Sequence, residues 1–406
     1  MSVIDIQNLD VVFSDKPQQA LQLLDQGLSR QEIIDQTNAV VGVHNASLKV
    51  AEGEICVLMG LSGSGKSSLL RTVNGLNPIS RGKLLVKDGD RTVDLANCDE
   101  ATLRHLRTNR VSMVFQKFAL MPWLSVLDNV AFGLEMKGID KKTRQASAME
   151  KLEMVGLQEW AHSLPHELSG GMQQRVGLAR AFAMDTDILL MDEPFSALDP
   201  LIRAQLQDEL IELQKNLKKT IIFVSHDLDE ALKIGSHIAI MESARIIQHG
   251  EPEQIVLNPE TAYVEDFVAH TNPLNVLGGR TLMTPTHKLE QQGNKVILDH
   301  NHHYWVELDQ GKIVQAGKGE QTLPQQEWQQ LSMAEKAQDK QAGHKVSSIG
   351  KGCFSITSPD INMREAINLR YDSQLPVLLQ ENGQFAGVLN DNNFYYALLG
   401  KHFVAD

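Results

Sequence analysis

The chain has 406 residues and a formal net charge of −13, and it contains no run of about 18 apolar residues that would indicate a membrane span. Its length predicts two or three domains, and its acidity argues against a general nucleic-acid-binding surface, because such surfaces are rich in Lys and Arg. Three widely spaced cysteines, Cys56, Cys98 and Cys353, indicate free thiols rather than a disulfide or a metal site. The first residues lack the basic and apolar segments of a secretory signal, so we expect a cytosolic protein.

The sequence before the first glycine-rich loop predicts two strands separated by an insert. Residues 3–13 alternate apolar and polar side chains, which predicts an edge strand. Between residues 16 and 36, apolar side chains recur at loosely helical spacing on both sides of Gly27, which predicts two short amphipathic helices. We interpret this insert, residues 14–38, as a packing element without chemistry. Residues 40–58 resume the strand pattern.

A glycine-rich loop follows the apolar run of residues 55–59 and precedes a helix-forming run. It consists of Gly60, Leu61, Ser62, Gly63, Ser64, Gly65, Lys66, Ser67 and Ser68. Glycines let successive backbone N–H groups turn inward to hold phosphate oxygens, and the helix N-terminus adds unpaired donors. Lys66 supplies a positive charge for the β- and γ-phosphates, and the Ser67 hydroxyl is placed to bind Mg²⁺. The pattern therefore predicts a phosphate-binding loop, or P-loop.

Beyond the P-loop, runs with strand and helix patterns alternate. The predicted strands cover residues 81–86, 91–95, 111–116, 188–193, 220–226, 238–241 and 245–247. The predicted helices cover residues 140–155, 172–183, 201–217 and 228–234. The helical character of residues 117–185 indicates a helical subdomain inserted into an α/β core. The alternation elsewhere predicts a parallel sheet with its functional site at the strand ends.

Four polar side chains stand at the ends of apolar strands. Asp192 and Glu193 end one strand, where the first acid can hold the Mg²⁺ shell and the second can activate a water that attacks the γ-phosphate. Gln116 and His226 end two others, so we expect both at the same sheet edge as Lys66. Gln116 suits contact with the metal and the attacking water, and His226 suits a γ-phosphate sensor that orients Glu193. Taken alone, each of these two side chains is more often an ordinary polar residue at a strand end.

A second helix N-terminus carries a hydroxyl and two glycines: Ser169, Gly170 and Gly171. Such an end is again suited to an anion. Because the P-loop already encloses one side of a γ-phosphate, we expect this second end to approach the phosphate from another subunit.

The run LSGGMQQR at residues 168–175 resembles the signature motif of ABC (ATP-binding cassette) proteins. Its companions stand in that family's order: the P-loop, a Q-loop at Gln116, a Walker B strand with Asp192 and the catalytic Glu193, a D-loop at residues 196–199 and an H-loop at His226. The resemblance covers residues 40–250. It implies an α/β P-loop NTPase cassette over residues 1–272, with a RecA-like mixed sheet and the helical subdomain.

The resemblance also implies the ligands and the assembly. ATP and Mg²⁺ are the expected cofactors, and a second copy of the chain is the expected partner in a head-to-tail pair. Each ATP would lie between the P-loop of one copy and residues 169–171 of the other, with Asp199 of the D-loop at the site. Ser67, Gln116 and Asp192 would surround the Mg²⁺. The family places an aromatic residue that stacks on adenine before the P-loop, and Phe13 is the candidate here.

Finer features resemble the ATPase subunits of quaternary-amine importers, which take up glycine betaine, choline, proline betaine or related osmoprotectants. These features are the insert, the P-loop run of residues 60–68, residues 74–76, residues 121–138 and Met172 in place of the usual signature Gln. The resemblance implies that the chain lies at the cytoplasmic face of the inner membrane, held there by a separate integral membrane permease. It also implies a substrate-binding protein that acts indirectly, and no nucleic acid. The alternatives are a soluble ABC ATPase of translation or DNA repair, an importer ATPase for another solute, and a regulatory ATP-binding protein without turnover.

After about residue 272 the composition changes. Residues 273–350 predict a β-rich segment, with a small meander at residues 295–315, followed by a polar linker or exposed helix from residue 317. His300, His302 and His303 indicate a solvated turn rather than a metal site, because no acid or Cys stands at ligand spacing.

Residues 351–406 resemble a CBS module, which gives a smaller α+β region after the cassette. In the family pattern G-x-x-[ST]-x-x-D, the hydroxyl and ribose-binding carboxylate are replaced here by Asn390 and Asn393. We therefore expect a degenerate regulatory or packing module.

Overall fold

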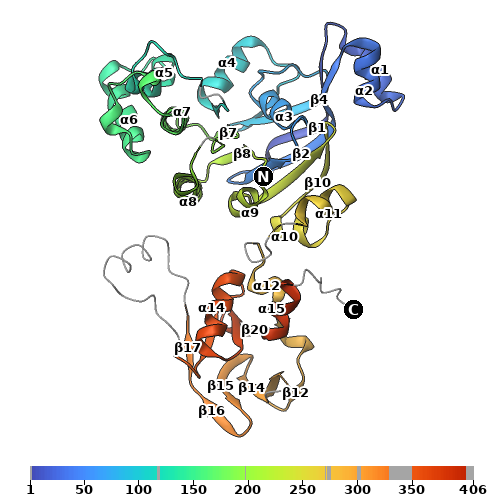
Figure 1. Cartoon of the computed structure of the whole chain (residues 1–406), viewed down its shortest axis with the longest axis vertical. Coiled ribbons are helices and arrows are strands. Elements are labelled where there is room, and N and C mark those ends of the chain that lie inside the picture. The colour runs from blue at the N-terminus through green and yellow to red at the C-terminus, as the bar shows by residue number, and fades with distance from the viewer. Residues whose placement is uncertain are drawn as a thin grey trace. The chain divides into compact units, whose positions relative to one another are not determined.

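The computed structural model describes residues 2–116, 119–196, 198–269, 271, 276–299, 303–328 and 350–398. The chain divides into two compact units, Met1–Ala269 and His270–Asp406, and each is described by itself (Figure 1). Among the helices of these described ranges, none is long and apolar enough to cross a membrane.

A six-stranded sheet forms the centre of the first unit. Its strands are β3 (Ile55–Met59), β6 (Val111–Val114), β7 (Ile188–Asp192), β8 (Thr220–Val224), β9 (His237–Glu242) and β10 (Arg245–Gly250). They lie in the order β10-β9-β3-β8-β7-β6, with every neighbouring pair parallel except β10 and β9. Strands β3, β7 and β8 are buried at every position, which explains their uninterrupted apolar sequences. Their carboxyl ends meet at one edge, as the alternation of elements predicts.

A second, four-stranded antiparallel sheet packs against the first. It comprises β1 (Ser2–Phe13), β2 (Val40–Ala51), β4 (Arg81–Asp88) and β5 (Arg91–Asp94), in the order β2-β1-β4-β5. The prediction that residues 3–13 form an edge strand is wrong, because β1 pairs with strands on both sides. The alternation of apolar and polar side chains indicates that one face of the strand is buried, but it does not indicate how many strands pair with it. Side chains such as Ile4, Leu84 and Ile222 fill the core between the sheets.

Helices surround the sheets of the first unit. Their bounds are α1 (Pro17–Asp25), α2 (Arg30–Thr37), α3 (Lys66–Val73), α4 (Glu100–Asn109), α5 (Val126–Met136), α6 (Lys141–Met154), α7 (Gly170–Ala183), α8 (Pro200–Leu217), α9 (Leu228–Ile234), α10 (Pro252–Leu257) and α11 (Ala262–Val268). The two helices predicted in the insert are confirmed as α1 and α2. Helices α5 to α7 group to one side with a core of their own that includes Val130, Leu152 and Val176 (Figure 1). Helices α4, α10 and α11 were not predicted.

The second unit contains two five-stranded sheets. One has the order β12 (Gln291–Gln292), β13 (Lys295–Asp299), β14 (Tyr304–Asp309), β15 (Lys312–Lys318) and β16 (Gln321–Leu323). The other has the order β11 (Thr284–Pro285), β20 (Gln384–Leu389), β19 (Val377–Glu381), β18 (Phe354–Thr357) and β17 (Gln325–Glu327). The helices are α12 (Gly279–Leu282), α14 (Met363–Ser373) and α15 (Asp391–Leu398).

The structure confirms the meander at residues 295–315, and it places strands where the sequence predicted a linker. Strands β16 and β17 lie within residues 317–350, and β17 pairs in parallel with β18. One sheet therefore takes strands from both sides of residue 350. The pattern of polar, Gln-rich residues concealed these strands because their side chains are mostly exposed. Residues 329–349, and with them much of the predicted linker, lie outside the described part, as do His300 and His302.

Asn393 serves packing within the second unit. Its side chain is buried, and its Nδ2 donates hydrogen bonds to the Leu282 carbonyl at 2.7 Å and to the Thr284 hydroxyl at 3.1 Å. The Asn390 N–H donates to its Oδ1 at 2.7 Å. These bonds join α15 to α12 and β11, which is the kind of use expected of a packing module; the likeness to CBS modules stays a prediction.

Candidate functional site

The P-loop connects the end of β3 to the start of α3, and its backbone leaves no room for side chains at two positions. Gly60 has φ +139°, and a Cβ there would lie 2.1 Å from the Met241 carbonyl oxygen. Gly65 has φ +107°, and its Cβ would lie 2.4 Å from the Gly42 carbonyl oxygen. Any other residue at either position would strain the backbone and clash with it, so the sequence has glycine where this tight path requires it.

Lys66 is the buried cation of the loop. Its residue exposure is 5%, and its Nζ donates hydrogen bonds to the carbonyl oxygens of Gly60 at 2.8 Å and Leu61 at 2.9 Å. Burial lowers the pKa of Lys66, while the nearby carboxylates of Glu193 and Asp192 act in the opposite direction. The Lys66 amine is thus held inside the loop as a hydrogen-bond donor, close to the carboxylates of Glu193 and Asp192.

Ser67 and Asp192 bring two oxygen donors together. The Ser67 hydroxyl donates to Asp192 Oδ1 at 2.7 Å, and Arg71 Nη2 donates to Oδ2 of the same carboxylate at 2.9 Å. Asp192 ends β7 and is fully buried. Mg²⁺ in nucleotide sites is usually held by one or two protein oxygens together with phosphate oxygens and waters. The hydroxyl and carboxylate fit such an ion, and no group of three or more His, Cys, Asp or Glu side chains gathers elsewhere in the described ranges.

Glu193 stands at the centre of the other predicted residues. Its φ is +48°, an uncommon value for a non-glycine residue, which turns the chain sharply after β7. Gln116 Nε2 donates to Glu193 Oε2 at 3.2 Å, and His226 Nδ1 lies 3.4 Å from the same oxygen. The structure therefore brings Gln116, Glu193 and His226 together, as their positions at strand ends predict.

Ser169 and the two glycines after it form a separate helix end. The Ser169 hydroxyl accepts a hydrogen bond from the Met172 N–H at 3.3 Å, and a Cβ on Gly170 would meet no atom within 4 Å. Among the described residues, no hydrogen bond joins residues 169–171 to the P-loop. Further along α7, Gln174 Nε2 donates to the Glu193 carbonyl oxygen at 3.4 Å. Helix α7 thus contacts the site through Gln174, while its first turn stays open.

Phe13 lies close to the P-loop helix despite the insert that follows it. Its ring Cε2 lies 2.5 Å from the point where a Cβ of Gly42 would be, and the Ser68 hydroxyl lies 3.1 Å from that point. The residue is 38% exposed, which leaves part of the ring open to a ligand. The insert therefore leaves Phe13 beside the P-loop helix.

The structure gives Asp199 a local role at the start of α8, where its carboxylate accepts a hydrogen bond from the Ile202 N–H at 3.1 Å. No contact between Asp199 and the P-loop is present within the described residues. Ala197 of the predicted D-loop lies outside the described part of the chain.

Three residues around this site were missed by sequence reasoning. Arg71 pairs with Asp192, Tyr263 accepts a hydrogen bond from the Leu61 N–H at 3.3 Å, and Arg30 donates to the Gly63 carbonyl at 2.9 Å. Arg71 stands four residues after Ser67, on the same face of α3, so helical spacing could have indicated it. No motif pointed to the other two, since they come from α11 and from the insert.

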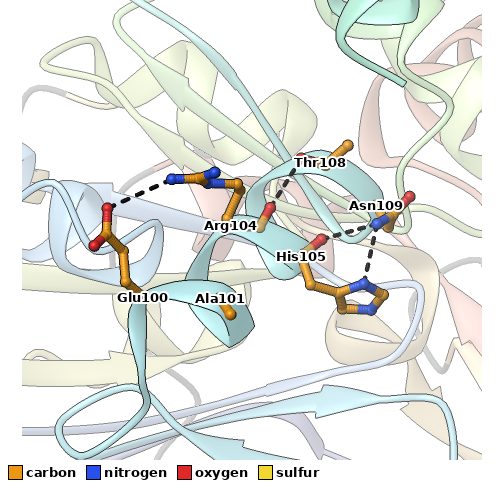
Figure 2. Close-up of a pocket in the computed structure, with 6 residues that line it drawn as sticks. All are labelled: Glu100, Ala101, Arg104, His105, Thr108 and Asn109. Carbon is orange, nitrogen blue, oxygen red and sulfur yellow. Dashed lines mark hydrogen bonds and ion pairs between the residues drawn. The ribbon is translucent and has the colours of Figure 1, made fainter. Parts of the chain in front are cut away.

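A hollow on α4 is distinct from this site. Figure 2 shows its lining, which comes from α4 itself: Glu100, Ala101, Arg104, His105, Thr108 and Asn109. Glu100 and Arg104 form an ion pair of 3.6 Å, and Asn109 Nδ2 lies 3.2 Å from His105 Nδ1. Most polar groups of this hollow therefore pair with a group one turn away on α4. No residue of the predicted motifs lines the hollow.

Comparison with known proteins agrees with the geometry. A family model described as "ABC transporter" matches residues 43–196. The chain is 52% identical over 264 residues to the glycine betaine/proline betaine transport system ATP-binding protein ProV of Escherichia coli, a match that spans 65% of this chain and only 65% of ProV. It is 38% identical over 407 residues to the glycine betaine/carnitine transport ATP-binding protein GbuA of Listeria monocytogenes, a match that covers 99% of this chain and 98% of GbuA.

Solved structures of cassettes are also similar. One is a dimeric, post-hydrolysis ATP-binding cassette bound to ADP and Pi, with 27% sequence identity and a TM-score of 0.53; the match covers 61% of this chain and 98% of that cassette. The family match, the near full-length likeness to GbuA and the arrangement of P-loop, Asp192 and Glu193 agree with one another. The chain belongs to the ABC transporter family, among the ATP-binding proteins named for glycine betaine transport.

Proposed function

We propose that this chain is the ATP-hydrolysing subunit of an importer for glycine betaine or a related quaternary amine, such as choline or proline betaine. The observation that carries the proposal is the convergence of Lys66, Ser67 and Asp192 with Glu193, Gln116 and His226 at one sheet edge. A binding protein without turnover has no need of a carboxylate held between an amide and an imidazole. The names of the relatives support the solute class.

The P-loop end binds the triphosphate. Backbone N–H groups of the loop and the N-terminus of α3 attract phosphate oxygens, and Lys66 exchanges its two carbonyl partners for the β- and γ-phosphates. Ser67 and Asp192 would hold Mg²⁺, which supplies charge neutralisation when bound. Phe13, beside Ser68, offers its partly exposed ring to the adenine.

Glu193 acts as the general base. Its carboxylate accepts a proton from the water that attacks the γ-phosphorus, as the bond from the γ-phosphorus to the bridging oxygen breaks and ADP leaves. Gln116 donates to the carboxylate and keeps it pointing into the site. The side chain of His226 is 62% exposed, so it can contact both Glu193 and a γ-phosphate. Such a base contributes roughly 10²–10⁴ in rate.

The site is completed by a second copy. Residues 169–171 leave the N-terminus of α7 open, and among the described residues no hydrogen bond joins them to the P-loop. A head-to-tail pair places this end against the γ-phosphate held by the other copy, with Asp199 near the junction. The pair then works on a permease at the cytoplasmic face of the inner membrane, with a separate protein that delivers the solute, and without nucleic acid. The second unit serves regulation or packing.

Reconstitution tests the function. The chain is purified with the membrane protein that accompanies it from its host, placed in lipid vesicles, and assayed for phosphate release with glycine betaine, choline and proline betaine. We expect ATP turnover that rises with one of these amines. Glu193→Gln in the same vesicles should lower turnover by at least about 10²-fold while ATP still binds, because only the base is lost.

Three outcomes would contradict parts of this proposal. Co-purification with ribosomes or DNA in place of a membrane protein would favour a soluble ATPase of translation or repair. Turnover stimulated by another solute would correct the substrate. Normal turnover in Glu193→Gln would remove Glu193 from its role.

A further inference from the structure

The insert contacts the P-loop directly. Arg30, the first residue of α2, donates from Nη1 to the carbonyl oxygen of Gly63 over 2.9 Å. In Figure 1, α1 and α2 lie together beside β1 and β4, in the same unit as the P-loop. The interpretation of the insert as a packing element omits this contact, which reaches the middle of the phosphate-binding loop.

Helix α2 presents Arg30 at a fixed position. The helix begins with a reciprocal cap, in which the Ser29 hydroxyl accepts from the Glu32 N–H at 3.3 Å and Glu32 Oε2 accepts from the Ser29 N–H at 2.8 Å. The Ser29 hydroxyl also donates to Glu32 Oε2 at 2.7 Å and holds the pKa of Glu32 below its usual range. One turn further on, Ile33 is fully buried in a cluster with Leu21 and Val41. The cap and this anchor fix the first turn of α2, from which Arg30 reaches the loop.

Gly63 lies at an open position of the loop. It has φ +80°, and a Cβ built on it would meet no atom within 4 Å. Its neighbours are held differently: the Leu61 N–H donates to Tyr263, and the Ser64 carbonyl accepts from the Ala244 N–H at 3.0 Å. Arg30 supplies the corresponding contact at Gly63.

We propose that Arg30 is a positioning residue for nucleotide binding, through which the insert keeps the P-loop in its phosphate-binding conformation. The proposal rests on the proposed ATPase function. A loop that is already in its bound conformation loses less conformational entropy when the phosphates arrive, and it therefore binds them more tightly. Arg30 acts on the loop and remains outside the reacting groups, so it affects ATP binding more than the chemical step.

The test compares Arg30→Ala with Gln31→Ala in the full chain. Gln31 lies next to Arg30 on α2, and its Nε2 bonds to Asp35 on the same helix at 2.8 Å, away from the loop. For Arg30→Ala we expect the KM for ATP to rise roughly three- to tenfold with kcat within about twofold, as for a lost hydrogen bond that acts on binding. Arg30→Lys, which keeps a cationic donor, should recover most of the affinity. Gln31→Ala should leave both constants unchanged.

Hydrogen exchange separates a lost contact from a loosened insert. We expect Arg30→Ala to speed exchange of the amides in residues 60–66 and to leave those in α1 unchanged. Faster exchange in α1 without a change in residues 60–66 would overturn the proposal, and so would a KM equal to that of Gln31→Ala. Either result leaves the ATPase function standing, because absence of ATP turnover in the unaltered protein is the result that would remove that function.

Discussion

The N-termini of α3 and α7 both present glycines and hydroxyl groups, yet only one is complete within the chain. At α3, Gly65 begins the helix without a side-chain cap, Lys66 is buried over the loop, and Ser67 bonds to Asp192. At α7, Ser169 caps its own helix and Gly170 faces open space. The difference is that cationic and metal-binding side chains surround the N-terminus of α3, whereas under the proposed function α7 would meet such groups only on another copy.

Among changes that distinguish the two helix ends, a negative charge at α7 should have the largest effect. Gly170→Asp places a carboxylate where the proposed partner copy brings its γ-phosphate, so repulsion should lower ATPase activity on the order of 10- to 100-fold. ATP binding to a single chain should remain normal, because no hydrogen bond among the described residues joins α7's first turn to the P-loop. Gly170→Ala is the control, since a Cβ there meets no atom within 4 Å.

Light scattering gives the second measurement for this variant. With ATP, the Glu193→Gln protein should form dimers. The double variant Glu193→Gln with Gly170→Asp should remain monomeric under the same conditions. Dimers in both would show that the two helix ends do not meet across a pair as proposed.

A smaller effect should come from the ring beside α3. Phe13→Ala should raise the Kd for ATP about five- to tenfold, which matches the lower end of the roughly 1–3 kcal/mol that a base gains by stacking on an aromatic ring. Binding of inorganic triphosphate, which has no base, should be unchanged, and Phe13→Trp should restore ATP affinity. Equal losses for ATP and triphosphate would instead indicate that the ring only supports Gly42 and α3.

The smallest effect should be a pH dependence of the Kd for ATP, which arises from Lys66 at the start of α3 and has no counterpart at α7. Because burial lowers the pKa of Lys66 from 10.5, the amine of the free protein loses its charge at a lower pH than an exposed lysine does. The Kd for ATP, measured by calorimetry, should therefore rise by a few-fold as the pH increases through this lowered pKa. Lys66→Arg keeps its charge across that range and should show no rise. The same rise in both proteins would assign the titration to another group.

The motif residues of the site could be predicted because strand ends are readable from sequence. Gln116, Asp192, Glu193 and His226 each follow an apolar run, and parallel strands bring such ends to one edge. The order of strands in a sheet cannot be read from the sequence in this way. For this reason β1 was predicted at an edge, although it pairs with a strand on each side. Polar strands such as β16 leave almost no signal either, since neither face is well buried.

Contacts that depend on the packing of distant elements could not be predicted from the sequence. Arg30 and Tyr263 reach the P-loop from elements far away in the chain, and nothing in their own neighbourhoods marks them. Phe13 illustrates the converse. The insert follows Phe13 directly in the chain, yet the pairing of β1 with β2 places its ring near Ser68.

The pairing of β17 with β18 has a consequence for the history of the gene. Recombination that joins coding sequences between residues 269 and 270 exchanges a whole compact unit and leaves both sheets of the second unit intact. A crossover near residue 350 would separate β17 from its neighbour β18. It would also divide one hydrophobic core, because Val306 lies before residue 350 and its core neighbours Phe354 and Leu378 lie after it. Exchange of C-terminal segments among such genes should therefore occur at the first boundary and avoid the second.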